Sequence, residues 1–399
     1  MRRVAVTGVG AVTALGPDAA SLDRGLRQGH SGIRELTLFD PSGYRSRLAA
    51  QAPDPAALQS FDDLSGASRP DRFGLQATLE AVRQAGLEPQ ELRRAACVFG
   101  TGSGGAIETE VYLRRFLGEG EDAADPALLV PHQPASVTDL VCRAFGIHGP
   151  RLTIMTACSS SATAIGYAGD LIRLGRADYA VAGGAEGLCR LTYSGFNALR
   201  ALSPEPCRPF DVARKGISLG EGAAILVLEE AERARARGAT ILGYLVGFGI
   251  TADAHHMTAP HPEGDGAARA MLAALADAGL SPEDIDYINA HGTGTPQNDA
   301  AETAAIRRVF GARTTRVPVS STKSMVGHTL GAAGAVEAVV SLLSLRGGYL
   351  PPTAHLETPD PALDLDFIGP IPRTAQAETV LSSSFAFGGN NTVLVFQRD

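Results

Sequence analysis

Short strand-like runs that end in glycine constrain the fold of this chain more than any other feature. The N-terminal run RVAVTGVG and the segments 95–105, 178–186 and 286–295 are apolar and lead into glycine-rich or polar loops. Helix-like stretches lie between them, for example 267–280 and 299–311. Apolar strands that alternate with helices are typical of a parallel sheet buried on both faces. The pattern therefore predicts an α/β fold.

Two segments of the chain resemble each other. Residues 218–230 and 386–398 both read as a small-residue turn followed by an alternating apolar strand. We interpret the similarity as a faint internal duplication in which each half closes with the same hairpin, with chance similarity as the alternative. The period is far too long for a solenoid. A charged helical end at 232–240 then predicts two halves, 1–240 and 241–399.

Composition fits a soluble protein with a large core. The 399 residues are 44% hydrophobic and 20% charged, and no run of ~18 apolar residues predicts a membrane span. The N-terminal apolar run is broken by Thr7 and Gly8, so it predicts a first strand and not a signal peptide. We expect a cytoplasmic protein.

Several binding classes are disfavoured. A net charge of −8 argues against broad nucleic-acid binding. Five cysteines without CxxC spacing predict neither a disulfide framework nor a zinc site. Gly8 and Gly10 fit part of a dinucleotide fingerprint, but Thr13 stands at its third glycine. We therefore expect no metal and no nucleotide.

One cysteine lies where its thiol could react. Cys158, in TACSSSAT, follows a strand-like run and precedes a helix-like one, so we expect a sharp strand-to-helix turn. Ser159, Ser160 and Ser161 are good helix-capping types. Free N–H groups at a helix start favour a thiolate and can hold an oxyanion. Local context alone leaves a nucleophile and a buried packing residue as equal alternatives.

Two histidines lie in similar positions. His291 and His328 each follow a strand-like run, with Lys323 before His328 and Glu337 on the helix after it. Each histidine alone is more simply a structural residue. In open α/β sheets, however, functional residues gather beyond the carboxyl ends of the strands. Together, the cysteine and the histidines favour a catalytic site.

Four sequence blocks resemble a known family. TACSSSATAIG, NAHGTGTPQNDAAE, SSTKSMVGHTLGAAGAVE and SSSFAFGGNNTVLVF are similar, in this order, to the signatures of β-ketoacyl-acyl-carrier-protein synthases. These enzymes form the decarboxylating Cys-His-His branch of the thiolase superfamily, and the resemblance to its type II ketosynthases runs end to end. It implies a thiolase-like fold of duplicated halves in αβαβα layers, which would explain the internal similarity.

The resemblance also implies catalytic roles. Cys158 would take the acyl chain from its carrier as a thioester. His291 and His328 would donate hydrogen bonds to the malonyl thioester carbonyl and stabilise the enolate as CO₂ leaves. Lys323, paired with Glu337, would hold the network. The N–H groups of Cys158 and Phe387 would form the oxyanion hole, and Phe387 would gate the pocket.

Further residues would bind substrate. Thr293 and Thr295 match positions that contact the pantetheine arm. The other expected substrate-binding residues are Ser103, Phe385, Gly388 and Gly389. No redox or metal cofactor is expected, because the phosphopantetheine arm is on the carrier protein and decarboxylation supplies the carbanion. The two substrates would enter in sequence, with ping-pong kinetics.

Related classes differ at identifiable positions. Thiolases use a second cysteine near the C-terminus, whereas the last cysteine here is Cys207. Initiating synthases carry asparagine where His328 stands. Non-catalytic chain-length partners lack the nucleophile, so a purely binding role is a weaker alternative.

Three departures from the fatty-acid elongation pattern concern the substrate. The loop 201–211 is short, Ser103 replaces a bulkier apolar residue of the acyl pocket, and TACSSSA differs from the commoner TACTSG. We take these departures to favour a specialised polyketide or polyene pathway. Ordinary drift in a housekeeping fatty-acid elongation synthase is the alternative.

The partners follow from the same resemblance. Acyl carriers are acidic, so a basic entrance is expected despite the net charge, with candidate contacts Arg69, Arg72, Arg208, Arg214 and Lys215. We expect a homodimer, with a heterodimer formed with a chain-length-factor-like homologue as the alternative. No nucleic-acid or membrane partner is expected.

Overall fold

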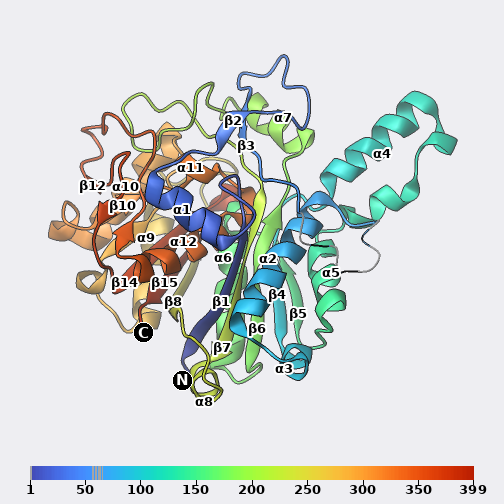
Figure 1. Cartoon of the computed structure of the whole chain (residues 1–399). Helices are drawn as coiled ribbons and strands as arrows, with labels where there is room; N and C mark the ends of the chain where they lie inside the picture. Colours follow the sequence, from blue (N-terminus) through green and yellow to red (C-terminus); the bar gives the residue numbers. More distant parts are fainter. Residues whose placement is uncertain (1, 56–57, 59–60, 62–63, 65) are drawn as a thin grey trace.

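The described strands form one large mixed sheet with helices on both faces, and two separate two-stranded sheets (Figure 1). The structure, a computed structural model, describes residues 2–399 except 56–57, 59–60, 62–63 and 65. Among these residues the main sheet has eleven strands in the order β12-β10-β9-β14-β15-β8-β1-β7-β6-β4-β5. The α/β class predicted from the alternating pattern is confirmed.

The sheet is built from two copies of one five-stranded unit. The first unit contains β1 (Val4–Val12), β4 (Ala96–Gly100), β5 (Arg151–Ile154), β6 (Tyr179–Glu186) and β7 (Gly222–Glu230). The second contains β8 (Gly243–Ala252), β9 (Tyr287–Asn289), β10 (Pro318–Ser320), β14 (Thr379–Phe385) and β15 (Asn390–Gln397), with β12 (Asp366–Phe367) added at its edge. From edge to centre, both units run in the order third, second, fourth, fifth, first strand. In this order, the first three strands of each unit are parallel to one another, and the fourth, β7 or β15, is antiparallel to both of its neighbours. The two central strands, β1 and β8, pair antiparallel and so join the units. The duplication is therefore confirmed.

The expected matching hairpins are present in only one unit. Strands β14 and β15 are joined by residues 386–389, which make a tight connection. Strands β6 and β7 also pair antiparallel, but residues 187–221 separate them, including α7 (Arg190–Ala198). The expectation of the same hairpin in both halves is wrong, because adjacency in a sheet does not require a short connection. The long connection supplies one wall of the cavity described below.

Helices cover the sheet in three layers. The contacting helices are α2 (Arg69–Ala85) and α5 (Ser136–Phe145) on the first unit, α9 (Asp265–Ala278) and α10 (Pro296–Phe310) on the second, and α6 (Ser160–Arg173) and α12 (Ala333–Gly347) between the units. Both α6 and α12 contact strands of both units as well as each other. The chain thus has the αβαβα layering that the resemblance implied.

The glycines of β1 are explained by helix packing. A Cβ on Gly8 would lie 2.1 Å from the Ala81 carbonyl oxygen, and one on Gly10 would lie 2.0 Å from the Ala77 oxygen. Both oxygens belong to α2, so these glycines allow the helix to lie against the strand. Their similarity to a dinucleotide fingerprint is therefore a packing feature.

One stretch is apolar enough to cross a membrane by length and composition. Residues Leu330–Gly347 have a mean hydropathy of 1.3 over 18 residues, and 83% of the stretch is buried. The stretch contains α12, which is apolar around its circumference because protein surrounds it. The prediction of no membrane-length apolar stretch missed this segment, which is a core helix.

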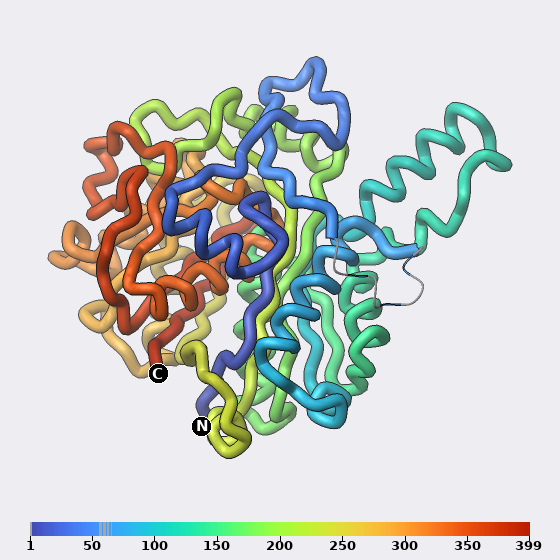
Figure 2. Tube along the Cα trace, viewed as in Figure 1, coloured from blue at the N-terminus to red at the C-terminus, as the bar shows by residue number. Residues whose placement is uncertain are grey.

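An arm projects from the body of the molecule (Figures 1 and 2). It consists of α4 (Ala106–Glu119) and a returning segment that includes η2 (Pro126–His132). The side chains of Leu117 and Val130 on this arm are 80% and 69% exposed.

The shorter elements of the chain are α1 (Ala19–Gln28), β2 (Ile33–Glu35), β3 (Leu48–Ala50), α3 (Pro89–Arg94), η1 (Glu121–Ala123), η3 (Ala157–Ser159), α8 (Ala231–Ala236), η4 (Pro282–Asp284), η5 (Gly311–Arg313), α11 (Lys323–Val326), η6 (Leu330–Ala332), β11 (Tyr349–Leu350), β13 (Arg373–Thr374) and η7 (Phe387–Gly389).

Candidate active site

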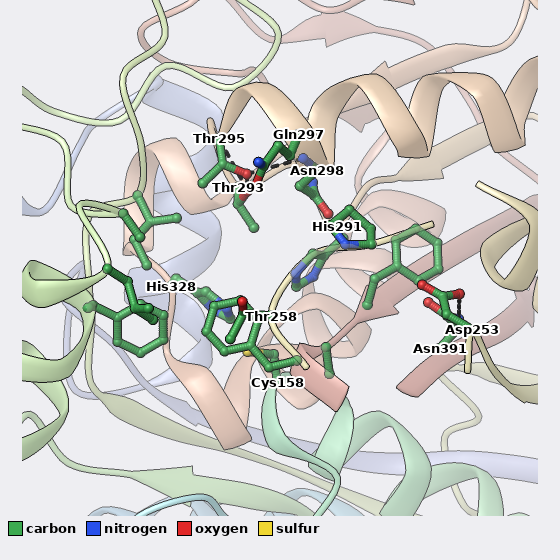
Figure 3. A pocket seen from close by; sticks show the side chains of 18 residues that line it. Cys158, Asp253, Thr258, His291, Thr293, Thr295, Gln297, Asn298, His328 and Asn391 are labelled. Atoms are coloured by element: carbon green, nitrogen blue, oxygen red, sulfur yellow. Dashed lines mark hydrogen bonds between the residues drawn. The ribbon is translucent and has the colours of Figure 1, made fainter. Parts of the chain in front are cut away.

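Three of the five predicted catalytic residues, Cys158, His291 and His328, line one cavity (Figure 3). It has a volume of about 840 Å³, including space open to solvent. Cys158 follows β5, His291 follows β9, His328 follows β10, and Phe387 follows β14. All four residues therefore lie just beyond the carboxyl ends of parallel strands, where α/β proteins place their sites. The lining also includes the predicted residues Thr293, Thr295 and Phe385.

Cys158 occupies a strained turn at the start of a helix. Residues Ala157–Ser159 form the short helix η3, and α6 begins at Ser160. Ala157 has a φ of 51°, a left-handed conformation that is unfavourable for alanine. The Ser159 hydroxyl donates to the Thr156 carbonyl oxygen at 2.9 Å, and the Ser160 hydroxyl donates to the Ala157 oxygen at 2.6 Å. The predicted strand-to-helix turn is confirmed, and these hydroxyls stabilise it.

The thiol of Cys158 is neutral at rest. Burial raises its pKa to about 12. The Lys323 charge and a hydrogen bond from the Phe387 N–H oppose this rise, whereas the Glu186 charge adds to it. The adjacent N-terminus of α6 also favours negative charge on the sulfur. The surroundings therefore stabilise charge that develops on Cys158 during reaction without ionising it beforehand.

His328 has a defined tautomer. The Leu330 N–H donates to Nδ1 of His328 at 3.3 Å, so Nδ1 is an acceptor and the proton of the neutral ring resides on Nε2. The backbone N–H of His328 is bound to the Ser218 carbonyl oxygen at 2.8 Å. Leu330 reaches its position with a φ of 46°. The loop thus holds a neutral imidazole whose Nε2–H is a hydrogen-bond donor.

His291 is held from its backbone. The Glu302 carboxylate, on α10, accepts hydrogen bonds from the N–H groups of His291 at 2.8 Å and Gly292 at 2.7 Å. The rings of His291 and His328 lie 5.3 Å apart, nearly perpendicular. Burial lowers the pKa of both histidines well below its ordinary value, and the Lys323 charge lowers it further. Both rings are therefore neutral donors near pH 7.

Lys323 and Glu337 form a buried ion pair next to the histidines. Their side chains are each only 2% exposed, and Nζ of Lys323 donates to Oε1 of Glu337. Burial raises the pKa of Glu337, and the Lys323 charge opposes the rise. The predicted pairing is thus present, and its cation contributes to the neutrality of both imidazoles.

The remaining lining suits a gated channel. The Phe387 ring stacks on Phe196 of α7 with ring centroids 5.6 Å apart. Gly388 and Gly389 follow it with φ angles of 79° and 74°, so this turn needs residues without a Cβ. The hydroxyls of Thr293 and Thr295, which also line the cavity, lie 2.9 Å apart (Figure 3).

Some predicted site residues lie elsewhere. Ser103 is outside the residues that line this cavity, and its hydroxyl binds the buried Glu186 carboxylate. The Arg69 guanidinium pairs with Glu221 and Asp54, and its side chain is 16% exposed.

Arg214 is similarly enclosed. Its side chain is 9% exposed and pairs with Asp299 and Asp360. Arg69 and Arg214 are therefore corrected to internal ion-pair residues, because their charges are already neutralised within the fold. Arg72 is exposed and Lys215 is 47% exposed, so both lie at the surface. Arg208 is only 21% exposed and pairs with Glu205 and Glu357.

Sequence reasoning missed several supporting residues. Glu302 stands eleven residues after His291, a spacing that fits a loop followed by a helix turn and that could have indicated its contact with the His291 backbone. The Asn391 side chain donates to Asp253 at 2.7 Å, and both residues line the cavity (Figure 3). No local pattern signals this pair, because it joins segments far apart in the chain.

Comparison with known proteins agrees with this geometry. Residues 1–234 match the family description "Beta-ketoacyl synthase, N-terminal domain", and residues 242–357 match "Beta-ketoacyl synthase, C-terminal domain". The chain is 41% identical over 412 aligned positions to 3-oxoacyl-[acyl-carrier-protein] synthase 2 of Coxiella burnetii, covering 100% of this chain and 99% of the relative.

Solved structures give the same result. The ishigamide ketosynthase/chain length factor matches with a TM-score of 0.96 and 38% identity, covering 100% of this chain and 99% of the other. A second match has a TM-score of 0.93 and 33% identity, and covers both chains fully. It is a type II polyketide synthase acyl-carrier protein in complex with its ketosynthase bound to the hexaketide.

Proposed function

Because the chain belongs to the β-ketoacyl synthase family, we propose that its cavity carries out a decarboxylative Claisen condensation between an acyl group on Cys158 and a malonyl group on an acyl carrier protein. The observation that carries these residue roles is the convergence of one thiol and two neutral imidazoles on a single cavity. A condensing enzyme needs a nucleophile and donors for a developing enolate, and no strong base.

The first half-reaction is a thioester exchange. The sulfur of Cys158 attacks the carrier-bound acyl carbonyl, the bond to the carrier sulfur breaks, and the thiol proton leaves with the carrier thiol. The N–H groups of Cys158 and Phe387 are the proposed donors to the tetrahedral oxyanion. The exchange replaces one thioester and one thiol by another thioester and another thiol, so its free-energy change is small and it is reversible.

The second half-reaction forms the carbon–carbon bond. The malonyl C–CO₂⁻ bond breaks, CO₂ leaves, and its electron pair becomes the enolate, whose oxygen accepts hydrogen bonds from His291 and His328. The enolate carbon attacks the acyl-Cys158 carbonyl, and the sulfur leaves and regains one proton from solvent. The product is a β-ketoacyl group on the carrier. These bond-forming and bond-breaking steps require no redox cofactor or metal.

Loading and condensation can be tested separately. Incubation with acyl-carrier should add one acyl mass to the peptide that contains Cys158, and malonyl-carrier should then release CO₂ and β-ketoacyl product. C158A should do neither. Equal condensation by C158A and the unmodified protein, or failure of the unmodified protein to take up an acyl group, would support the alternative of a non-catalytic binding partner.

For the pathway, we propose a specialised polyketide or polyene synthesis. Support comes from the departure of TACSSSA from the commoner TACTSG and from the similarity to the ishigamide and polyketide ketosynthases. The comparable identity to a 3-oxoacyl-[acyl-carrier-protein] synthase 2 keeps housekeeping elongation as the second candidate. A panel of carriers loaded with saturated, β-keto and polyene chains would decide. Strict preference for saturated chains would overturn the specialised assignment.

For partners, we propose an acidic acyl carrier protein and a second copy of this chain in a cytoplasmic homodimer. The exposed apolar side chains Leu117, Val130 and Met155 lie on the arm and just beyond the edge strand β5. A second copy that covered these apolar side chains would remove them from water. Light scattering on the purified chain should give twice the monomer mass, whereas a monomer that assembles only with a second homologue would favour the heterodimer.

A further inference from the structure

The carboxylate of Glu186 joins three segments next to the cavity. Glu186 is the last residue of β6, is 0% exposed, and is absent from the cavity lining. Its Oε2 accepts the N–H of Gly102 at 2.7 Å and that of Gly331 at 3.0 Å. Its Oε1 accepts the N–H of Ser103 at 2.9 Å and also the Ser103 hydroxyl. Each carboxylate oxygen of Glu186 thus accepts two hydrogen bonds, and neither acts as a donor.

The glycines around Glu186 show how closely these segments meet. A Cβ on Gly331 would lie 2.6 Å from the nitrogen of Gly102 and 2.7 Å from Oε2 of Glu186. A Cβ on Gly102 would lie 2.8 Å from the same oxygen. The loop after β4 and the start of η6 therefore approach each other only because both residues lack side chains.

The hydrogen bond between Gly331 and Glu186 lies close in the chain to His328. Gly331 directly follows Leu330, whose N–H sets the His328 tautomer and whose φ of 46° is strained. A strained backbone conformation costs of the order of 1–3 kcal/mol and persists only where surrounding contacts hold it. The hydrogen bond from Gly331 to Glu186 is such a contact, one residue from the strain.

We propose that Glu186 is a positioning residue that, by holding the Gly331 N–H, keeps the Leu330 N–H on Nδ1 of His328 and so keeps Nε2–H of His328 directed at the malonyl thioester. This inference rests on the proposed function and adds a residue to it. Because the same carboxylate binds Ser103, a displacement of the loop after β4 is transmitted to His328. Acyl transfer to Cys158 does not use His328. The Glu186 charge raises the pKa of Cys158, so its removal should not slow acyl transfer.

The test separates the two half-reactions. Glu186→Met keeps the length of the side chain but removes all acceptors, whereas Glu186→Gln retains one oxygen for Gly102 and Gly331. Each variant is first loaded from acyl-carrier and checked by intact mass. Malonyl-carrier is then added, and CO₂ release is followed in a single turnover. Glu80→Met is the matched control, because Glu80 is a partly buried carboxylate that accepts N–H bonds from Ala11 and Ala19.

The expected result is a split between steps. E186M should load at no less than about half the rate of the unmodified protein, because loss of the Glu186 charge favours the thiolate, and should release CO₂ at least about tenfold more slowly. E186Q should lie between the two in CO₂ release, and E80M should be unchanged in both steps. Equal losses in loading and decarboxylation, or none in E186M, would overturn the proposal. If E186M does not fold, Gly331→Ala displaces the same contact and should give the same split, and its absence would equally overturn the inference. Failure of the unmodified protein to load or decarboxylate would refute the proposed function instead.

Discussion

The Leu330 N–H donates to Nδ1 of His328 at 3.3 Å, and this one contact fixes which nitrogen of the ring faces the reaction as a donor. The tautomer is set by the backbone, without a carboxylate partner that would charge the ring. A neutral donor suits an enolate oxygen, because its hydrogen bond stabilises the developing negative charge without transferring a proton to the enolate.

Removing that donor should affect one half-reaction. H328A should lower the rate of decarboxylation by about 10²–10³-fold, the usual loss for one oxyanion-hole donor. Acyl loading on Cys158 should stay within about threefold, because it uses other donors. Intact mass and CO₂ release measure the two steps, and equal losses in both would argue against a role confined to the enolate.

The two histidines should not titrate at the ordinary histidine pKa. Burial lowers the pKa of His291 and His328 well below 6.5, so both rings stay neutral as the pH falls from 8 to 6. Burial also raises the pKa of Glu302 and Glu337 to about 7, so the reaction rate over this window reports these carboxyls as well as the rings. The imidazole NMR signals should therefore show no protonation of either ring between pH 8 and 6, and a ring that protonates with a midpoint near 6.5 would contradict this prediction.

Breaking the Lys323–Glu337 pair should destabilise the fold. K323M leaves the Glu337 carboxylate buried without its cation, which typically costs about 3–5 kcal/mol. The double variant K323M/E337M removes both charges and should recover part of that loss. Chemical denaturation measures the free energy of unfolding. A double variant less stable than K323M would contradict this account.

Surface and internal arginines should behave differently. R208E should weaken carrier binding, and more so at low salt than at high salt, if Arg208, whose side chain is 21% exposed, contributes to the proposed contact with an acidic carrier. R69M should instead lower the melting temperature, because it leaves the fully buried Glu221 side chain unpaired. Carrier affinity titrated at two salt concentrations, together with a thermal melt, distinguishes them. Unchanged carrier affinity in R208E would remove Arg208 from the docking surface.

The sequence predicted those features of the molecule that depend on residues close together in the chain. The turn at Cys158, the loops of His291 and His328 and the duplicated strands follow from apolar runs that end in small or polar residues. The resemblance added Phe387 and the Lys323–Glu337 pair. Two surface expectations failed for a shared reason: the charges of Arg69 and Arg214 are neutralised by Glu221 and Asp360, residues distant in the chain.

The supporting carboxylates could not be predicted for the same reason. Glu186 binds residues 102–103 and Gly331, contacts that arise only when both halves pack together. The 187–221 connection likewise breaks the hairpin symmetry between the halves without disturbing strand pairing. Periodicity reports the environment of a segment, whereas these features depend on which distant segment is its neighbour.

The central claim is that Cys158 is the acyl acceptor, and intact-mass analysis after incubation with a panel of acyl-carriers tests it most directly. We predict a mass gain of one acyl group, located by digestion on the peptide containing Cys158 and absent from C158A. A mass gain that persists in C158A, or no gain with any carrier in the panel, would contradict the account.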